Sequence, residues 1–120
     1  MQKLAKREEQ IMQACWHLGK AFIKEIIAEL PDPKPHYNSV ATMVRILEDK
    51  GFLGHETFGN TFRYHPVVTK EQYQKHAFRD IVRQYFNNSY PSMLAYFAKE
   101  QKMSQEELNE ILEIIKSQKK

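Results

Sequence analysis

The residues best suited to bind another molecule form one polar stripe in the segment 38–50. Asn38, Thr42 and Arg45 recur at intervals of four and three residues, so a helix places them on one face. An asparagine amide pairs with adenine, an arginine guanidinium pairs with guanine, and a threonine methyl contacts the methyl group of thymine. The stripe therefore has the chemistry needed to read base edges in DNA. The alternative is an ordinary solvated helix face, which has the same polarity.

Two further polar residues, Asn60 and Arg63, lie on or beside a segment with the pattern of a β-hairpin. The pair Gly59-Asn60 is typical of a tight hairpin turn. Side chains at such a place can contact phosphates, which position a protein on the duplex without specifying its sequence. The alternative is an exposed ion pair between Arg63 and Glu56 across the hairpin.

Nothing in the pattern of residues predicts catalysis, a metal site or a cofactor. The chain has no glycine-rich phosphate loop and no G-x-S-x-G motif, and its five histidines lack the spacing of a metal site. Its one cysteine, Cys15, lies on the apolar face of the first predicted helix, which favours a small buried hydrophobe over a redox sensor. We expect a protein that is not an enzyme and that needs no cofactor.

The order of the predicted elements is that of a winged helix-turn-helix domain. Apolar periodicity predicts helices over about 4–18 and 22–30, and a proline-rich loop follows the second. A third helix starts with Asn38 as its N-cap, and strands at 52–57 and 61–65 form the hairpin, or wing. In this architecture the third helix is the one that enters the major groove. The order of elements therefore favours DNA reading by the polar stripe.

From residue 69 onward the pattern changes to helices alone. Thr69 with Gln72, and Ser104 with Glu107, match the S/T-x-x-E/Q capping box, which marks two helix starts. A short helix over 92–99 lies between them.

The helical tail carries more apolar surface than three short helices can hide among themselves, and such a surplus indicates an association surface. We therefore expect a mainly α protein and a homodimer. Its winged helix-turn-helix DNA-binding domain would span 1–68, and an α-helical dimerisation arm would span 69–120. The predicted interface residues are Ile81, Tyr85, Leu94, Phe97, Leu108, Ile111, Leu112 and Ile115.

Composition limits the remaining classes. The 120 residues, 42% of them hydrophobic, are enough for a small domain with an oligomerisation arm. The chain has no run of about 18 apolar residues and no apolar N-terminal segment, so we expect no membrane insertion, no secretion and a cytoplasmic location. The net charge of +3 is spread over both halves, so the DNA-binding prediction rests on pattern and not on bulk charge.

Four segments together resemble the BlaI/MecI/CopY family of bacterial penicillinase repressors. They are Glu9-Gln10-Ile11-Met12 with Trp16, YNSVATMVRILEDKGF at 37–52, GNTFRY at 59–64, and SMLAYFAK at 92–99. The resemblance implies a dimeric winged-helix repressor of a palindromic double-stranded DNA operator. It also implies that Ser39, Thr42 and Arg45 lie on the recognition helix. Ala5 stands where the family has a serine or threonine cap, which predicts a small loss of helix stability.

The resemblance further implies that a membrane sensor-transducer protease system releases the repressor by cleavage between Tyr96 and Phe97; release by a ligand is the alternative. The copper-responsive branch of the family carries paired tail cysteines, and this chain has none after Cys15, which disfavours copper sensing. The alternative to a repressor is a winged-helix protein-interaction module without specific DNA binding. The equal numbers of basic and acidic residues in 36–64 support that alternative.

Overall fold

The computed structural model describes residue 1 and residues 3–118, with side chains as far as residue 114. It divides into two compact units, Met1–Ala77 and Phe78–Lys120, and the division falls inside α4. The elements are α1 (Lys6–Leu18), α2 (Ile23–Glu29), α3 (Tyr37–Asp49), β1 (Leu53–Phe58), β2 (Thr61–Pro66), α4 (Lys70–Phe86), α5 (Tyr90–Glu100) and α6 (Gln105–Gln118).

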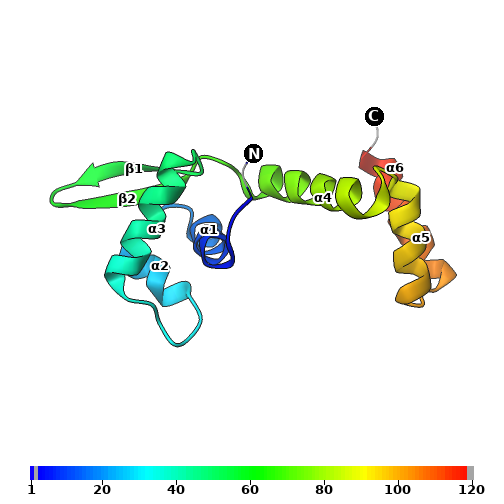
Figure 1. Ribbon diagram of the computed structural model, residues 1–120, viewed down its shortest axis with the longest axis horizontal. Helices are drawn as coiled ribbons and strands as arrows, with labels where there is room; N and C mark the ends of the chain where they lie inside the picture. The colour runs from blue at the N-terminus through cyan, green and yellow to red at the C-terminus, as the bar shows by residue number, and fades with distance from the viewer. Residues whose placement is uncertain (2, 119–120) are drawn as a thin grey trace. The chain divides into compact units, whose positions relative to one another are not determined.

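The first unit is a winged helix-turn-helix fold, as the order of predicted elements indicated. Three helices are followed by a two-stranded antiparallel hairpin that extends from the end of α3 (Figure 1). An isolated bridge between Ala21 and Tyr64 joins the hairpin to the start of the α2 segment. The core lies between α1, α2, α3 and the base of the hairpin, and its fully buried members include Ile11, Met12, Ile26, Val40, Val44, Leu47 and Phe52.

The hairpin turn confirms the interpretation of Gly59-Asn60. Phe58 pairs with Thr61, so Gly59 and Asn60 alone connect the strands. Gly59 has a φ of 57°, a left-handed conformation that glycine adopts without strain and that two-residue hairpin turns require. The turn therefore sets the register of the wing.

The prediction that Asn38 caps the third helix is wrong. The helix begins one residue earlier, at Tyr37, because the Val40 N–H already donates to the His36 carbonyl at 3.2 Å. His36 is the N-cap residue and makes no side-chain capping bond. Asn38 thus lies inside the first turn, and its exposed side chain is not engaged in capping.

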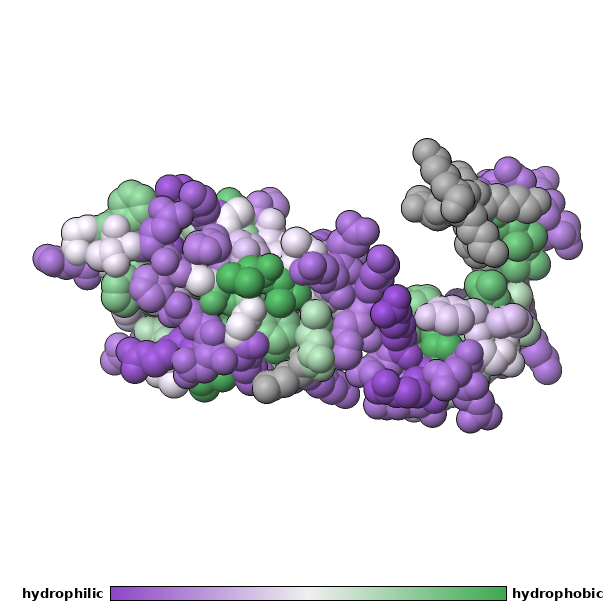
Figure 2. Space-filling model, turned by 90° about the horizontal axis from the view of Figure 1, so that it is seen from above, coloured by the Kyte–Doolittle hydropathy of each residue, from purple (hydrophilic) through white to green (hydrophobic). Residues whose placement is uncertain are grey.

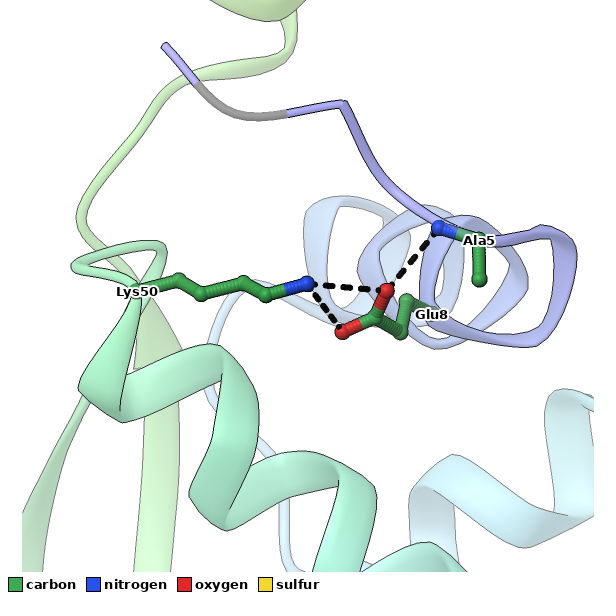
Figure 3. A network of polar contacts seen from close by, with 3 residues as sticks. All are labelled: Ala5, Glu8 and Lys50. Carbon is green, nitrogen blue, oxygen red and sulfur yellow. Dashed lines mark hydrogen bonds and ion pairs between the residues drawn. The ribbon is translucent and has the colours of Figure 1, made fainter.

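The start of α1 and the end of α3 are joined by one ionic contact (Figure 3). Glu8, at the third position of α1, accepts a hydrogen bond from the Ala5 N–H at 2.9 Å, which is half of a capping box. Its two oxygens also accept from Lys50 Nζ at 2.8 and 3.1 Å. Glu8 therefore compensates in part for the capping hydroxyl that Ala5 lacks at the start of α1. It also links α1 to the C-terminal end of α3.

The N-terminal part of α4 closes one side of the first unit. Tyr73 packs against Trp16 and Phe52 with ring centroids 5.6 and 6.0 Å apart, and its hydroxyl donates to Glu9 at 3.2 Å. Trp16 Nε1 donates to the Val68 carbonyl at 2.9 Å. These contacts explain why the first unit extends to Ala77, although the DNA-binding domain was predicted to end at residue 68.

As far as residue 118, the regular elements of the second unit are all helices, and Val82 and Met93 are buried. Both predicted capping boxes are present, one in each unit: in the first, Thr69 Oγ1 accepts from Gln72 N at 3.1 Å, and in the second, Ser104 Oγ accepts from Glu107 N at 3.1 Å. The helix predicted over 92–99 is longer and begins at Tyr90, because Ser89 Oγ caps it by accepting from Ser92 N. Among the residues described, no helix has the length and apolar character needed to cross a membrane.

Candidate nucleic-acid interface

The outer face of α3 gathers the side chains predicted to read DNA. Asn38, Ser39, Thr42 and Arg45 are all exposed. The opposite face, with Val40, Val44 and Leu47, is fully buried, so packing in the core fixes which side of the helix faces outward.

The hydroxyl of Thr42 makes a hydrogen bond within α3. Its Oγ1 donates to the Asn38 carbonyl at 2.9 Å, the back-bonding that threonine often makes inside helices. Thr42 can therefore offer a base the acceptor lone pairs of its hydroxyl and its methyl, which suits contact with the methyl group of thymine.

Two exposed apolar residues of α3 were not among the predicted site residues. Tyr37, the first residue of the helix, is 46% exposed, and Ile46 is 40% exposed. They are nine positions apart on the helix, so they are single exposed side chains and do not form one apolar patch. Their positions beside Asn38 and Arg45 in the sequence could have revealed them.

The wing holds Arg63 in an arrangement that the sequence did not predict. Its guanidinium carbon lies 5.9 Å from the ring centroid of Phe22 and 5.8 Å from that of Phe58, within the range of cation–π contacts. Glu56 faces Arg63 in register, but it pairs with Lys20 at 3.2 Å. The alternative of an Arg63–Glu56 ion pair is therefore wrong, because Lys20, from the loop before α2, takes the carboxylate. Asn60 is exposed in the turn.

The junction between α3 and the wing is a polar and aromatic cluster. His55 Nδ1 lies 2.6 Å from Glu48 Oε2, and the imidazole stacks on Phe62 with ring centroids 4.2 Å apart. Burial raises the pKa of the Tyr64 hydroxyl, the nearby charge of Glu48 adds to the rise, and Arg45 opposes it. Side chains of α3 and of both strands therefore meet beside the polar stripe of α3.

Cys15 is completely buried in the core of the first unit. Burial raises the pKa of its thiol to about 12, so the thiolate needed for redox chemistry is scarcely formed at neutral pH. The interpretation of Cys15 as a small core hydrophobe is confirmed.

The second unit leaves much of its apolar surface uncovered within one chain, as the green side chains on the right of Figure 2 show. Of the predicted interface residues, Ile81, Tyr85, Phe97 and Leu112 are exposed, with Tyr85 at 74%. Leu94, Leu108 and Ile111 are half-buried, and the side chain of Ile115 lies outside the described residues. Further exposed apolar residues of this unit are Phe78, Tyr90, Tyr96 and Ile114.

The winged helix carries an outward polar stripe on its third helix, and its sequence matches the penicillinase repressor family model over residues 4–117. The chain belongs to the penicillinase repressor family. It is 26% identical over 122 residues to the penicillinase repressor of Bacillus licheniformis, covering 98% of this chain and 92% of the relative. It is 20% identical over 114 residues to the methicillin resistance regulatory protein MecI of Staphylococcus aureus, covering 94% and 93%. The resemblance found in the sequence is thus confirmed, and the family is one of transcriptional repressors.

A solved structure described as the CopR repressor is also similar to this penicillinase repressor family member. The two chains are 30% identical with a TM-score of 0.46, and the match covers 54% of this chain and 96% of that one.

Proposed function

We propose that this chain is a homodimeric transcriptional repressor that binds a palindromic DNA operator through α3 and the hairpin β1–β2. The observation that carries the proposal is the exposed polar stripe of α3, which stands opposite a fully buried apolar face. A helix held in this way can present its stripe to the major groove without losing its place in the core.

The side chains of the stripe have distinct roles in this proposal. Arg45 donates two hydrogen bonds from its guanidinium to guanine, and Thr42 contacts a thymine methyl. Asn38 and Ser39 contact base edges or the adjoining DNA backbone. Asn60 and Arg63 of the wing bind phosphate and position the protein on the duplex. The two rings beside Arg63 limit its motion, which favours one orientation of the guanidinium.

Dimerisation through 69–120 is supported by the exposed apolar residues of the second unit. A symmetric dimer presents two recognition helices to half-sites about one helical turn, or 10 bp, apart or a multiple of it. Linking two half-site contacts increases the overall affinity by about 10²–10⁴.

Release by a membrane sensor-transducer protease system, with cleavage between Tyr96 and Phe97, extends the proposal. Both side chains are exposed, at 52% and 42%, although Tyr96 also packs against Phe86 with ring centroids 5.6 Å apart. Cleavage there would detach α6 from the rest of the arm. Mass spectrometry of the protein from induced cells tests this step, and an intact chain under full derepression would favour release by a ligand.

The decisive test of DNA reading is selection of bound duplexes from a random DNA pool, which should recover a two-fold symmetric sequence. Thr42→Ala and Arg45→Ala should then each weaken the selected site by about 1–3 kcal/mol while sparing random DNA. Arg79→Ala, which removes an exposed arginine from the second unit, is the matched control and should leave discrimination unchanged. Equal losses on selected and random DNA would assign Thr42 and Arg45 to backbone contact.

The test of dimerisation is Leu112→Glu in α6, followed by sedimentation at micromolar concentration. Leu112 is 48% exposed in one chain, and a charge buried at an interface without a partner is strongly unfavourable. Asn109→Glu adds the same charge to the same helix at an exposed polar position and should leave the dimer intact. A Leu112→Glu variant that stays dimeric would place the interface elsewhere.

A protein-interaction module on the same scaffold is the second candidate function. The observation that favours it is the charge of residues 36–64, where Arg45, Lys50 and Arg63 are balanced by Glu48, Asp49 and Glu56. Affinity for DNA must fall steeply as salt rises, because phosphate contacts release counterions. A cytoplasmic location and the absence of enzymatic activity accompany either candidate.

A further inference from the structure

A contact between a histidine and a glutamate connects the recognition helix to the wing. Glu48 lies in the last turn of α3 and His55 is the third residue of β1, and their side chains approach to 2.6 Å. The two side chains are 23% and 32% exposed, so the contact is partly shielded from water. The imidazole also stacks on Phe62 at 4.2 Å, which holds it in place from the second strand.

Aromatic and charged side chains of α3 and of the second strand surround this pair. On the His55 face of the hairpin, register places Tyr64 directly opposite His55, with ring centroids 5.8 Å apart. His65 neighbours Tyr64 in the strand and therefore points to the other face. Tyr64 of β2, opposite His55, is in electrostatic contact with Glu48, Tyr37 and Arg45 of α3.

Glu48 has a second potential partner on its own helix. Arg45 lies three residues earlier, and side chains at i and i+3 are neighbours on a helix surface. Arg45 is also the exposed residue best suited to pair with guanine. A carboxylate that turns toward Arg45 would occupy the guanidinium that DNA requires, whereas a carboxylate held by His55 leaves it available.

We propose that His55 is a positioning residue for DNA recognition: its charged imidazole holds Glu48 against the wing and so frees Arg45 to bind the operator. A neutral imidazole that donates through Nδ1 holds the carboxylate less strongly than a charged one, so that Glu48 turns toward Arg45 more often and operator affinity falls. The proposal rests on the DNA-binding function proposed above and adds to it a dependence of operator affinity on proton concentration.

The direction of the pH effect follows from the charges. Histidine ordinarily changes charge between about pH 5 and 8, while glutamate stays ionised over most of that range. Affinity should therefore rise as the pH falls from about 8 to about 6. Ion pairs at this degree of exposure change an equilibrium by roughly twofold to fivefold, which is the change expected for each half-site.

The test measures the dissociation constant of the full chain for a selected symmetric duplex at pH 6 and pH 8, at fixed ionic strength. The wild-type chain should bind more tightly at pH 6. His55→Gln should lose this difference, and Glu48→Gln should lose it while binding tightly at both pH values. Full pH dependence in Glu48→Gln would overturn the proposal, because it would mean that charged His55 attracts phosphate directly. A wild-type chain with equal affinity at both pH values would overturn it as well.

The chain contains a matched control pair. His17 Nδ1 and Glu29 Oε1 lie 3.0 Å apart and join α1 to α2. His17→Gln removes a histidine–glutamate pair of the same kind and should keep the wild-type pH dependence. Loss of the dependence in His17→Gln would show a general electrostatic effect and would also overturn the proposal.

A measurement without DNA separates this proposal from the proposed function. In ¹⁵N NMR spectra of the free protein, the Arg45 side-chain N–H signal, assigned by its loss in Arg45→Lys, should shift between pH 8 and pH 6. In Glu48→Gln it should not shift. If the signal behaves in this way but no duplex is bound, the DNA-binding function fails alone. If the wild-type signal does not move, the role of His55 fails whatever the protein binds.

Discussion

Replacing Lys50 with methionine tests whether the contact between the start of α1 and the end of α3 stabilises the first unit. Methionine keeps an unbranched apolar side chain and removes only the ammonium group. Glu8, which is 8% exposed, would then keep the hydrogen bond from the Ala5 N–H and lose both hydrogen bonds from Lys50 Nζ. A nearly buried carboxylate would be left without its counter-charge.

The expected loss follows from the geometry of the contact. Hydrogen bonds to charged groups contribute about 1.5–3 kcal/mol, and breaking a fully buried ion pair costs about 3–5 kcal/mol. The Lys50 side chain is 23% exposed, so water recovers part of the interaction and the lower range applies. A loss of about 2 kcal/mol lowers the melting temperature of a domain of this size by roughly 8–16 °C.

The same contact predicts how stability depends on pH. Burial disfavours the charged form of Glu8, but the hydrogen bond from Lys50, the Ala5 N–H and the Lys50 charge outweigh it and hold the pKa of this carboxyl below its ordinary value. A lowered pKa in the folded state means that the carboxylate stabilises the protein above the ordinary glutamate pKa. That stabilisation is lost as the pH falls through the lowered value. The stability difference between wild type and Glu8→Gln should therefore shrink between about pH 5 and pH 3.

Urea unfolding followed by the fluorescence of Trp16 measures these differences, because this side chain packs inside the first unit. The control is Lys20→Met, which breaks the exposed pair with Glu56, whose side chains are 53% and 49% exposed. It should cost less than about 1 kcal/mol. A Lys50→Met loss no larger than that of Lys20→Met would refute the reasoning, as would a difference for Glu8→Gln that persists at pH 3.

Three further outcomes are expected. Cys15, whose thiol pKa is raised to about 12 by burial, should resist a maleimide at pH 8 and react when urea unfolds the chain; rapid labelling of the folded protein would contradict this. Ser89→Ala should lower the free energy of unfolding by about 0.5–2 kcal/mol, because Ser89 Oγ accepts from Ser92 N at 3.1 Å, and Ser89→Asp should restore it. Gly54→Ala should destabilise the hairpin by about 1–3 kcal/mol, since its Cβ would lie 2.9 Å from His65 Nε2; an unchanged melting temperature would mean that the imidazole moves aside freely.

Sequence alone determined the features that depend on contacts between residues only a few positions apart in the chain. The capping boxes at Thr69 and Ser104 depend only on a spacing of three residues, and both are present. The hairpin turn depends on a glycine that accepts a positive φ, and it falls at Gly59-Asn60. The exposed stripe of α3 follows from helical periodicity, because an apolar face that enters the core leaves Thr42 and Arg45 outside. The fold class and the exposed polar stripe of α3 could be predicted for this reason.

Tertiary structure decided which partner each charged side chain meets. Lys50 binds Glu8, 42 positions away in the sequence. Glu56 pairs with Lys20 and not with Arg63, which lies against two aromatic rings. Several acidic residues are available to each lysine or arginine, and periodicity does not distinguish among them. The choice depends on how α1 crosses α3 and on where the wing leaves the helix, which are properties of the packed core. The pair Glu48–His55 belongs to the same class, since a contact between a helix end and a strand exists only once the core has brought the two together.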